Sequence, residues 1–363
     1  MSSLHELLKA AVEHGASDVH LKSDKPPVFR THQELRTVEG YPISPERMEA
    51  LVAELLPPHL KDRFHSQNEA DFSFTEEDVG RFRVNVFRSC GEANFVMRHV
   101  KTIVPTIEDL HLPPVMRKIA HSHRGIVIAS GTTGCGKSTS LAAIIREINE
   151  TERRRIITVE DPIEYTFHDD QSVISQREVG LDTLSFHAAL RHVLRQDPDV
   201  IMIGEMRDSE SFTAALAAAE TGHLVLSTLH TGTAAQAVPR ILDFFPASER
   251  DQLRLALADN LRAVFCQRLV PSIQGGVRPA VEILINTPTV RKLIEKSALE
   301  KLNAAIEVGG DDGMQTFNQA VYHMIRGGII TEEMGMQYAS NSESLRMNLK
   351  GIFLDESKRI LAT

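Results

Sequence analysis

The stretch Gly125-Ile-Val-Ile-Ala-Ser-Gly-Thr-Thr-Gly-Cys-Gly-Lys-Ser138 decides how most of this chain folds. Its first half is an apolar run that predicts a short buried strand, and its second half matches the pattern G-x-x-x-x-G-K-[ST]. A strand, a glycine-rich loop and a helix in this order are the context that a phosphate-binding P-loop requires. The helix predicted over 137–149 supplies the last part, with one apolar face formed by Leu141, Ile144, Ile145 and Ile148.

The predicted loop would hold phosphate mainly through its backbone. Its glycines allow a tight turn that aims N–H groups inward, and the positive end of the following helix favours an anion. Lys137 is expected to reach the β- and γ-phosphates, and the hydroxyl of Ser138 is expected to bind Mg²⁺. The candidate nucleotide-binding residues are Gly131, Thr132, Thr133, Gly134, Cys135, Gly136, Lys137, Ser138 and Thr139.

The chain has three cysteines, Cys90, Cys135 and Cys266, and no pair of them has CxxC spacing. This sparse set argues against a zinc finger made of cysteines and against a disulfide framework, and it fits a reducing compartment. Cys135 lies near a helix N-terminus, a position that can lower the pKa of a thiol. A redox role therefore stays open beside the simpler interpretation of a small tolerated side chain.

Short β-rich runs alternate with helical patterns on the carboxyl side of the P-loop. This alternation is typical of a βαβ series, so we predict an α/β domain with a parallel sheet covered by helices. After about Ala247 the pattern is mostly helical. The expected strands span 126–129, 156–159, 200–203 and 224–227, and the expected helices span 137–149, 209–221, 254–265 and 316–325.

The residues before this domain have the pattern of a smaller mixed α/β domain. Period-two alternation predicts strands, and apolar residues at helical spacing predict helices. The expected helices span 4–11 and 45–56, with a strand over 18–22 and an antiparallel pair formed by 71–74 and 81–87.

A linker separates the two predicted domains. The stretch 105–114 contains three prolines and no long periodic run, which is typical of a domain boundary. We therefore divide the chain into residues 1–104, the linker 105–114, and residues 115–363.

Composition excludes several classes of protein. The chain carries 40 Lys+Arg and 49 Asp+Glu, which gives a net charge of −9 and a pI near 6.0. Nucleic-acid binders usually show a basic stripe or a basic pI, so stable binding of nucleic acid is disfavoured. The apolar runs are shorter than the roughly 18 residues that indicate a membrane span, and residues 1–11 do not resemble a secretory signal. We expect a cytosolic protein of two or three domains.

Carboxylates at strand ends are the candidates for orienting the water that attacks a bound nucleotide. Glu205 follows the strand predicted at 200–203, and Glu160 and Asp161 follow the strand predicted at 156–159. The carboxyl ends of parallel strands meet at the edge that holds the ligand. Glu205 is therefore the first candidate, and the acidic pair would bind Mg²⁺ through water or position the nucleophile. A helix cap or a solvated turn is the alternative for each carboxylate.

Histidines and arginines complete the candidate site. His223 and His230 flank the strand predicted at 224–227 and would point to opposite faces of it, so a shared metal ion is disfavoured. Contact with the γ-phosphate region and simple hydrogen bonding in place both stay open. Arg81 and Arg83 share one face of a predicted strand. Such a face is normally solvated, but beside a nucleotide it would supply an arginine finger.

An ordered series of motifs resembles the secretion and pilus ATPases, and in particular the type IV pilus retraction ATPases of the PilT/PilU kind. The resemblance covers nearly the whole chain, from Ala16-Ser-Asp-Val-His20 to Gly313-Met-Gln-Thr-Phe317. The motifs between them are 131–139 (GTTGCGKST), 159–164 (VEDPIE), 176–179 (QREV), 195–200 (RQDPDV), 204–208 (GEMRD), 219–223 (AETGH) and 228–231 (TLHT).

This resemblance implies a PAS-like N-terminal α+β domain followed by a RecA-like P-loop NTPase domain with a helical C-terminal part. It also implies ATP and Mg²⁺ as cofactors and a homohexameric ring, with arginines of the N-terminal domain closing over the ATP. The family roles fall on Lys137 and Ser138 in the P-loop, Glu160 and Asp161 in the acidic box, Glu205 as the catalytic glutamate, His223 and His230 in the histidine box, and Arg81 and Arg83 in the arginine strand.

The implied function is a motor that retracts type IV pili and powers twitching motility from the cytoplasmic face of the inner membrane. An inner-membrane platform protein would be its partner, so the chain would touch the membrane only through partners. The segment Thr289–Glu295 matches the family's AIRNLIRE segment only in part, and 286–288 and 344–347 resemble the PilU branch. Thr132 and Cys135 replace the proline and serine that are common in the PilT branch.

Two other functions stay open. One is an accessory nucleotide-binding subunit with little activity alone, in a ring mixed or stacked with a paralogous motor. The other is a DNA-transport or type II/IV secretion ATPase, which the acidic charge disfavours. The chain lacks the four-cysteine zinc insertion of pilus assembly ATPases, which argues against an extension motor.

Overall fold

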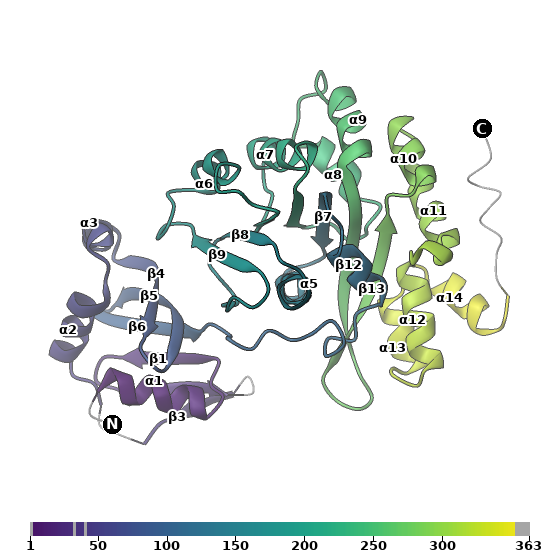
Figure 1. The fold of residues 1–363 in the computed structure, drawn as a ribbon. Coiled ribbons are helices and arrows are strands. Elements are labelled where there is room, and N and C mark those ends of the chain that lie inside the picture. The colour runs from purple at the N-terminus through teal and green to yellow at the C-terminus, as the bar shows by residue number, and fades with distance from the viewer. Residues whose placement is uncertain (1–2, 32–33, 40–41, 353–363) are drawn as a thin grey trace. The chain divides into compact units, whose positions relative to one another are not determined.

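The computed structural model describes residues 3–31, 34–39 and 42–352 (Figure 1). These residues form two compact units. Unit 1 comprises the described residues up to Ile103 together with Asp161–Thr166 and Glu178–Asp182, and unit 2 comprises the other described residues from Val104 onward. Two short segments of the later sequence therefore belong to the N-terminal unit.

Unit 1 is built on a six-stranded antiparallel sheet with the strand order β3-β2-β1-β6-β5-β4. Two three-stranded meanders meet where β1 pairs with β6. The strands are β1 Asp18–Lys22, β2 Val28–Thr31, β3 Glu34–Thr37, β4 Glu69–Glu76, β5 Gly80–Ser89 and β6 Glu92–His99. The helices are α1 Leu4–Glu13, α2 Pro45–Leu55, α3 Lys61–Gln67 and the 3₁₀ turn η1 Pro58–Leu60.

Local signals explain the elements of unit 1. The side chain of Ser3 caps α1 and that of Ser44 caps α2, and Pro45 stands at the first turn of α2, where its missing N–H costs nothing. The apolar face of β5 packs with residues of all three helices in one core. The predicted helices and strands of this part of the chain are confirmed, with ends that differ by a few residues. The fully buried side chains of β5 are Phe82, Val84 and Val86.

Unit 2 is built on a seven-stranded sheet with the order β13-β12-β7-β11-β10-β8-β9. The strands from β12 to β8 are parallel neighbours, and β13 is antiparallel to β12. The strands are β7 Gly125–Ser130, β8 Arg155–Glu160, β9 Val173–Glu178, β10 Val200–Ile203, β11 Leu224–Leu229, β12 Leu261–Pro271 and β13 Val277–Ile285.

The helices of unit 2 lie against both faces of this sheet. They are α4 Val115–Ala120, α5 Lys137–Thr151, α6 Phe186–Val193, α7 Ser209–Glu220, α8 Ala237–Leu242, α9 Arg250–Asn260, α10 Pro288–Glu295, α11 Leu302–Val308, α12 Phe317–Arg326, α13 Glu332–Tyr338 and α14 Ser342–Leu349, with 3₁₀ turns η2 Leu299–Lys301 and η3 Gly310–Asp312.

Alternate residues of the strands feed two separate apolar cores. In β7, Val127 and Ala129 pack with α4 and α5, whereas Ile126 and Ile128 pack with α7, α8 and α9. The sheet is thus buried on both faces, as expected for parallel strands. The C-terminal helices α12 to α14, yellow in Figure 1, follow the hairpin of β12 and β13, and α12 contacts β13.

The helix predicted over 254–265 is wrong in its second half. Helix α9 ends at Asn260, and residue 261 begins β12, the first strand of a hairpin with β13. The prediction of a mostly helical region after Ala247 missed both strands. The apolar run in β12 fits both the helical and the strand periodicity, and its hydrogen-bonded pairing with β7 makes it a strand. The missed local signal is the turn at Gly275 and Gly276, where both φ angles are positive.

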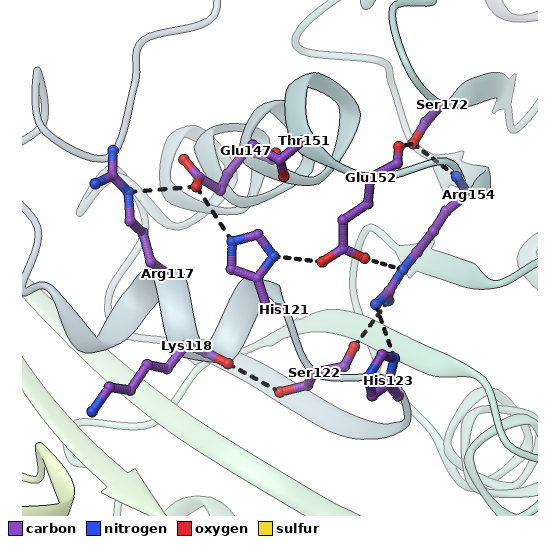
Figure 2. Close-up of polar contacts among 10 residues, drawn as sticks. All are labelled: Arg117, Lys118, His121, Ser122, His123, Glu147, Thr151, Glu152, Arg154 and Ser172. Atoms are coloured by element: carbon purple, nitrogen blue, oxygen red, sulfur yellow. Dashed lines mark hydrogen bonds and ion pairs between the residues drawn. The ribbon is translucent and has the colours of Figure 1, made fainter.

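A polar network at the amino edge of the sheet anchors the far end of the helix that follows the P-loop (Figure 2). His121, the C-cap of α4, lies between the carboxylates of Glu147 and Glu152 at the end of α5. Arg154 pairs with Glu152 and donates a hydrogen bond of 2.9 Å to the carbonyl oxygen of Ser122. The network joins α4, the carboxyl-terminal end of α5 and the residues before β8.

Candidate nucleotide-binding site

The predicted P-loop connects the carboxyl end of β7 to the amino end of α5. Gly131 has φ +133°, and a Cβ added there would lie 2.6 Å from the Sγ of Cys135 and 2.7 Å from the carbonyl oxygen of Gln267. Only glycine fits this position. Gly136 is the left-handed N-cap of α5, with φ +92°. The loop therefore needs its glycines for backbone shape and for close packing on β12.

Lys137 is folded into this loop. Its side chain is buried, and Nζ donates hydrogen bonds to the carbonyl oxygens of Gly131 at 2.9 Å and Thr132 at 3.0 Å. Both acceptors are neutral, so they satisfy two of the three N–H donors without cancelling the positive charge. The ammonium group can exchange these carbonyls for phosphate oxygens at the mouth of the loop.

Cys135 does not have the reactive character that its position suggested. Burial raises the pKa of the Cys135 thiol despite the charge of Lys137 and the backbone N–H groups nearby. Its Sγ also fills the space that makes Gly131 obligatory. Burial therefore outweighs the effect of the helix N-terminus on this pKa, and the interpretation as a small packing side chain is the one supported.

Glu205 and His230 come together across two neighbouring strands. They follow the ends of β10 and β11, which pair in parallel, and His230 Nε2 lies 3.1 Å from Glu205 Oε1. Arg207 Nη2 lies 2.6 Å from the other carboxylate oxygen of Glu205. Strand β11 also holds the segment around Glu205, because the Thr228 hydroxyl donates to the carbonyl oxygen of Gly204 at 2.7 Å and the N–H of Met206 donates to the carbonyl oxygen of Thr228 at 3.2 Å. Each oxygen of the Glu205 carboxylate thus has its own polar partner.

The contacts with Arg207 and His230 favour the ionised form of Glu205. Burial raises the pKa of Glu205, but the hydrogen bond and charge of Arg207, helped by His230 and Lys137, outweigh burial and leave that pKa below its ordinary value. The contribution of Lys137 means that the charge of the P-loop lysine reaches this carboxylate. Sequence reasoning missed Arg207, and the only signal for it was its place in the stretch 204–208.

Glu160 is buried at the end of β8, beside the same loop. It accepts hydrogen bonds from the hydroxyl of Thr158 at 2.7 Å and from the amide nitrogen of Gln176 at 3.3 Å. The ends of β8 and β10 lie side by side here, since a Cβ added at Gly204 would be in van der Waals contact with the Cα of Glu160 at 3.4 Å. The structure therefore brings Glu160 next to the residue that precedes Glu205.

His223 lies apart from this cluster. It precedes β11 at the amino edge of the sheet, whereas His230 follows β11 at the carboxyl edge. Its Nδ1 lies 2.9 Å from the carbonyl oxygen of Ala218 and 3.0 Å from the hydroxyl of Thr221, both at the end of α7. The structure thus brings His230 to Glu205 and leaves His223 holding a helix end.

The other candidate residues belong to unit 1. Arg81 and Arg83 lie on β5, and Arg81 Nη2 lies 3.0 Å from Glu178 Oε2. The buried carboxylate of Glu178 also accepts a hydrogen bond from the backbone N–H of Ile163 at 3.1 Å and one from the hydroxyl of Ser73. Glu178 thus ties both later segments of unit 1 to its sheet. Glu178 lies in the motif 176–179, but the sequence alone did not indicate its role.

One further candidate in unit 1 is Asp161, which directly follows Glu160 and is exposed. Among the residues that the structure describes, no group of three or more His, Cys, Asp or Glu is arranged to hold a metal ion. Mg²⁺ commonly takes one or two protein oxygens together with phosphates and waters. The hydroxyl of Ser138, in the first turn of α5, is such an oxygen donor. The residues therefore fit an ion that arrives with a nucleotide.

Comparison with known proteins places this geometry in a family. The family model described as "Type II/IV secretion system protein" matches residues 1–347. The type IV pilus ATPase PilU of Pseudomonas aeruginosa is 41% identical over 346 residues, which are 95% of this chain and 91% of that protein. The type IV pilus retraction ATPase PilT of the same organism is 40% identical over 339 residues, which are 93% of this chain and 98% of that protein.

A solved structure agrees with these relatives. The crystal structure of the pilus retraction motor PilT with bound ADP superimposes with a TM-score of 0.89 at 39% identity, covering 95% of this chain and 99% of that one. The fold class inferred from the sequence, a PAS-like α+β domain followed by a RecA-like P-loop domain with a helical C-terminal part, is confirmed. Within the described ranges, no helix is both long and apolar enough to cross a membrane.

Proposed function

This chain belongs to the family of type II/IV secretion system proteins, and we propose that it hydrolyses ATP to ADP and phosphate with Mg²⁺ as a cofactor. The observation that carries the proposal is the carboxylate of Glu205, held on both oxygens by Arg207 and His230. It stands at the same edge of the sheet as the P-loop. An ionised carboxylate at that edge can orient water for attack on a phosphate.

Binding of the nucleotide would use the loop first. The backbone N–H groups of 131–136 and the amino end of α5 would cradle the β-phosphate, and Lys137 Nζ would exchange its two carbonyl partners for phosphate oxygens. Ser138 would hold Mg²⁺ together with the phosphates. When bound, the ion neutralises the negative charge of the β- and γ-phosphates.

Hydrolysis would then use the carboxylate and its partners. Glu205 would accept a hydrogen bond from the attacking water and align it with the γ-phosphate, while Arg207 and His230 keep the carboxylate from rotating. Glu160 would support the same edge, since its Oε1 already accepts hydrogen bonds from Thr158 and Gln176. For His223 the contacts favour the role of a hydrogen-bonded structural residue.

We further propose that the protein assembles as a homohexameric ring. Arg81 and Arg83 would supply positive charge to the nucleotide, and Asp161 would complete the acidic pair with Glu160; the resemblance to the PilT/PilU ATPases supports these roles. Arg81 would have to leave Glu178 to reach a phosphate. The domain division into residues 1–104, 105–114 and 115–363 belongs to the same proposal.

In the cell, we propose that this ATPase powers type IV pilus retraction, and with it twitching motility, from the cytoplasmic face of the inner membrane. Support comes from its likeness to PilU, named a type IV pilus ATPase, and to PilT, named a retraction ATPase. The partner would be the inner-membrane platform protein of the pilus. A second candidate is an accessory subunit in rings with a paralogous motor, favoured by the segment Thr289–Glu295, where the family pattern is incomplete.

Two experiments test this proposal. Purified protein should turn over ATP only with Mg²⁺, and Lys137→Ala should abolish turnover because the loop loses its cation. A matched control is Lys292→Ala, a lysine in the last turn of α10 outside the candidate site, which should keep full activity. ATP turnover that survives Lys137→Ala would contradict the proposed site.

Deletion of the gene in its native host separates the cellular roles. Loss of twitching with an excess of surface pili supports retraction, and loss of surface pili would contradict it. Full retraction in the deletion strain, with wild-type motility, favours the accessory role. Complementation with the Lys137→Ala chain shows whether hydrolysis itself is needed.

A further inference from the structure

A buried glutamate on β13 has no part in the mechanism described so far. Glu282 is 1% exposed, and both of its carboxylate oxygens bind backbone N–H groups of distant segments. Oε1 accepts from Ala234 at 2.7 Å, and Oε2 accepts from Phe317 at 3.3 Å. Ala234 lies in the loop between β11 and α8, which begins at His230, and Phe317 is the first residue of α12. One side chain thus joins the candidate site to the C-terminal helices.

The stretch from His230 to Ala234, which we call the His230 loop, is held by β12 as well. The guanidinium of Arg268 donates hydrogen bonds to the carbonyl oxygens of Tyr338 at 2.7 Å and Gly232 at 3.4 Å. It also lies over the ring of Phe317, 3.8 Å from the centroid. Like Glu282, Arg268 therefore connects the His230 loop to α12. It also connects that loop to the end of α13.

The other end of the loop is fixed to the strand that carries the P-loop. The N–H of Thr231 donates to the hydroxyl of Ser130 at 2.9 Å, and Ser130 directly precedes Gly131. The thiol of Cys266 donates to the carbonyl oxygen of Thr231 at 3.4 Å. Burial raises the pKa of Cys266 to about 12, so this thiol keeps its proton and remains a donor.

These contacts leave the His230 loop little freedom of its own. Its first residue touches the carboxylate of Glu205, and its last residue is bound by Glu282. A shift of α12 relative to β13 would act on the same carboxylate that holds Ala234. The fit is specific, because a carboxylate offers acceptors on both oxygens and both partners here are donors.

We propose that Glu282 is a positioning residue, which sets the place of His230 against Glu205 and couples it to the start of α12. The proposal rests on the ATP hydrolysis proposed above and assigns its control to the C-terminal helices. Glu282 would touch neither nucleotide nor water. Its effect would be on the rate of hydrolysis, with little effect on nucleotide affinity, since the P-loop keeps its own contacts.

Glu282→Gln tests this positioning role, because it keeps the shape and replaces one acceptor by an NH₂ donor. We expect kcat to fall about tenfold to a hundredfold, the loss typical of a small misplacement near the chemistry, while the Kd for ADP stays within about twofold. The matched control is Thr287→Ala. Thr287 caps α10 by accepting a hydrogen bond from Val290, so its loss weakens a neighbouring helix without touching Ala234 or Phe317.

The two variants separate positioning from simple stability. Both should lower the melting temperature, but only Glu282→Gln should lower kcat. An unchanged kcat in Glu282→Gln, or an equal fall in Thr287→Ala, would overturn the proposal. If Glu282→Gln does not fold, Arg268→Lys replaces it, since a lysine cannot bind both carbonyls and stack on Phe317.

Hydrogen exchange keeps this inference distinct from the proposed function. Wild-type protein without ATP turnover would contradict the proposed function alone. The amides of the His230 loop would still report on Glu282. Faster exchange at Ala234 in Glu282→Gln but not in Thr287→Ala supports the coupling, and unchanged exchange in Glu282→Gln overturns it.

Discussion

Replacement of Gly131 by alanine tests whether the P-loop depends on the packing that the structure shows. The added Cβ would lie 2.6 Å from the Sγ of Cys135 and 2.7 Å from the carbonyl oxygen of Gln267, at a φ of +133°. A positive φ costs an L-residue about 1–2 kcal/mol, and overpacking a closed site costs about 1–3 kcal/mol more. We therefore expect Gly131→Ala to lower the free energy of unfolding by about 2–5 kcal/mol and to weaken ADP binding.

Gly134→Ala is the matched control in the same loop. Gly134 also has a positive φ, +79°, but an added Cβ would meet nothing within 4 Å. This variant should show only the cost of the φ angle, about 1–2 kcal/mol. The difference between the two variants isolates the steric cost.

Urea unfolding followed by circular dichroism gives both free energies, and calorimetric titration gives the affinity for ADP. The double variant Gly131→Ala with Cys135→Ala should recover only part of the loss, because the contact with the main chain of Gln267 remains. If Gly131→Ala and Gly134→Ala agree within about 0.5 kcal/mol, the packing argument is refuted.

Three further predictions follow from the ion pairs and the loop. Arg207→Ala should shift the acid limb of the pH–rate profile to higher pH, because Arg207 is the main group that holds the pKa of Glu205 below its ordinary value against burial; an unmoved limb would show that another group sets it. Arg154→Ala should lower the free energy of unfolding by about 1–3 kcal/mol, because the half-buried carboxylate of Glu152 loses its ion pair with the Arg154 guanidinium. Thermal unfolding of the variant measures this loss. Ser138→Ala should raise the Mg²⁺ concentration needed for half-maximal turnover, and an unchanged requirement would remove Ser138 from the ion site.

The elements of the fold that could be predicted are those with local signals. The apolar runs of β7, β8, β10 and β11 and the helical faces of α5 and α7 are visible in short windows of sequence, and the structure confirms them. Helix α12 was also predicted, and its capping residue Thr316 explains its start. Strands β2, β3, β6, β9, β12 and β13 and helices α3, α4, α6 and α8 were not predicted, and α10, α11, α13 and α14 were expected only as part of a mostly helical region. In β12 the apolar pattern suits both helix and strand, so only its pairing with β7 settles the matter.

The residues of the candidate site likewise fall into those with a local sequence signal and those without one. The P-loop is continuous in sequence, so its residues and their order could be predicted directly. The contact between Glu205 and His230 depends on β10 and β11 being neighbours, which a single sequence indicates only through the βαβ rule. Arg207 had no signal of its own. Glu282 lies in an apolar strand more than 40 positions from Ala234, and nothing in its local pattern indicates that it binds a loop.

The central claim is that Glu205 is the catalytic carboxylate of an ATPase. The most direct test is steady-state ATP turnover with Mg²⁺ by wild-type protein and by Glu205→Gln, with Glu210→Gln as the control, a first-turn residue of α7. Glutamine keeps the size but removes the charge, so we predict a loss of about a hundredfold or more in kcat, an unchanged Kd for ADP, and full activity in the control. Equal turnover in wild type and Glu205→Gln would contradict the account.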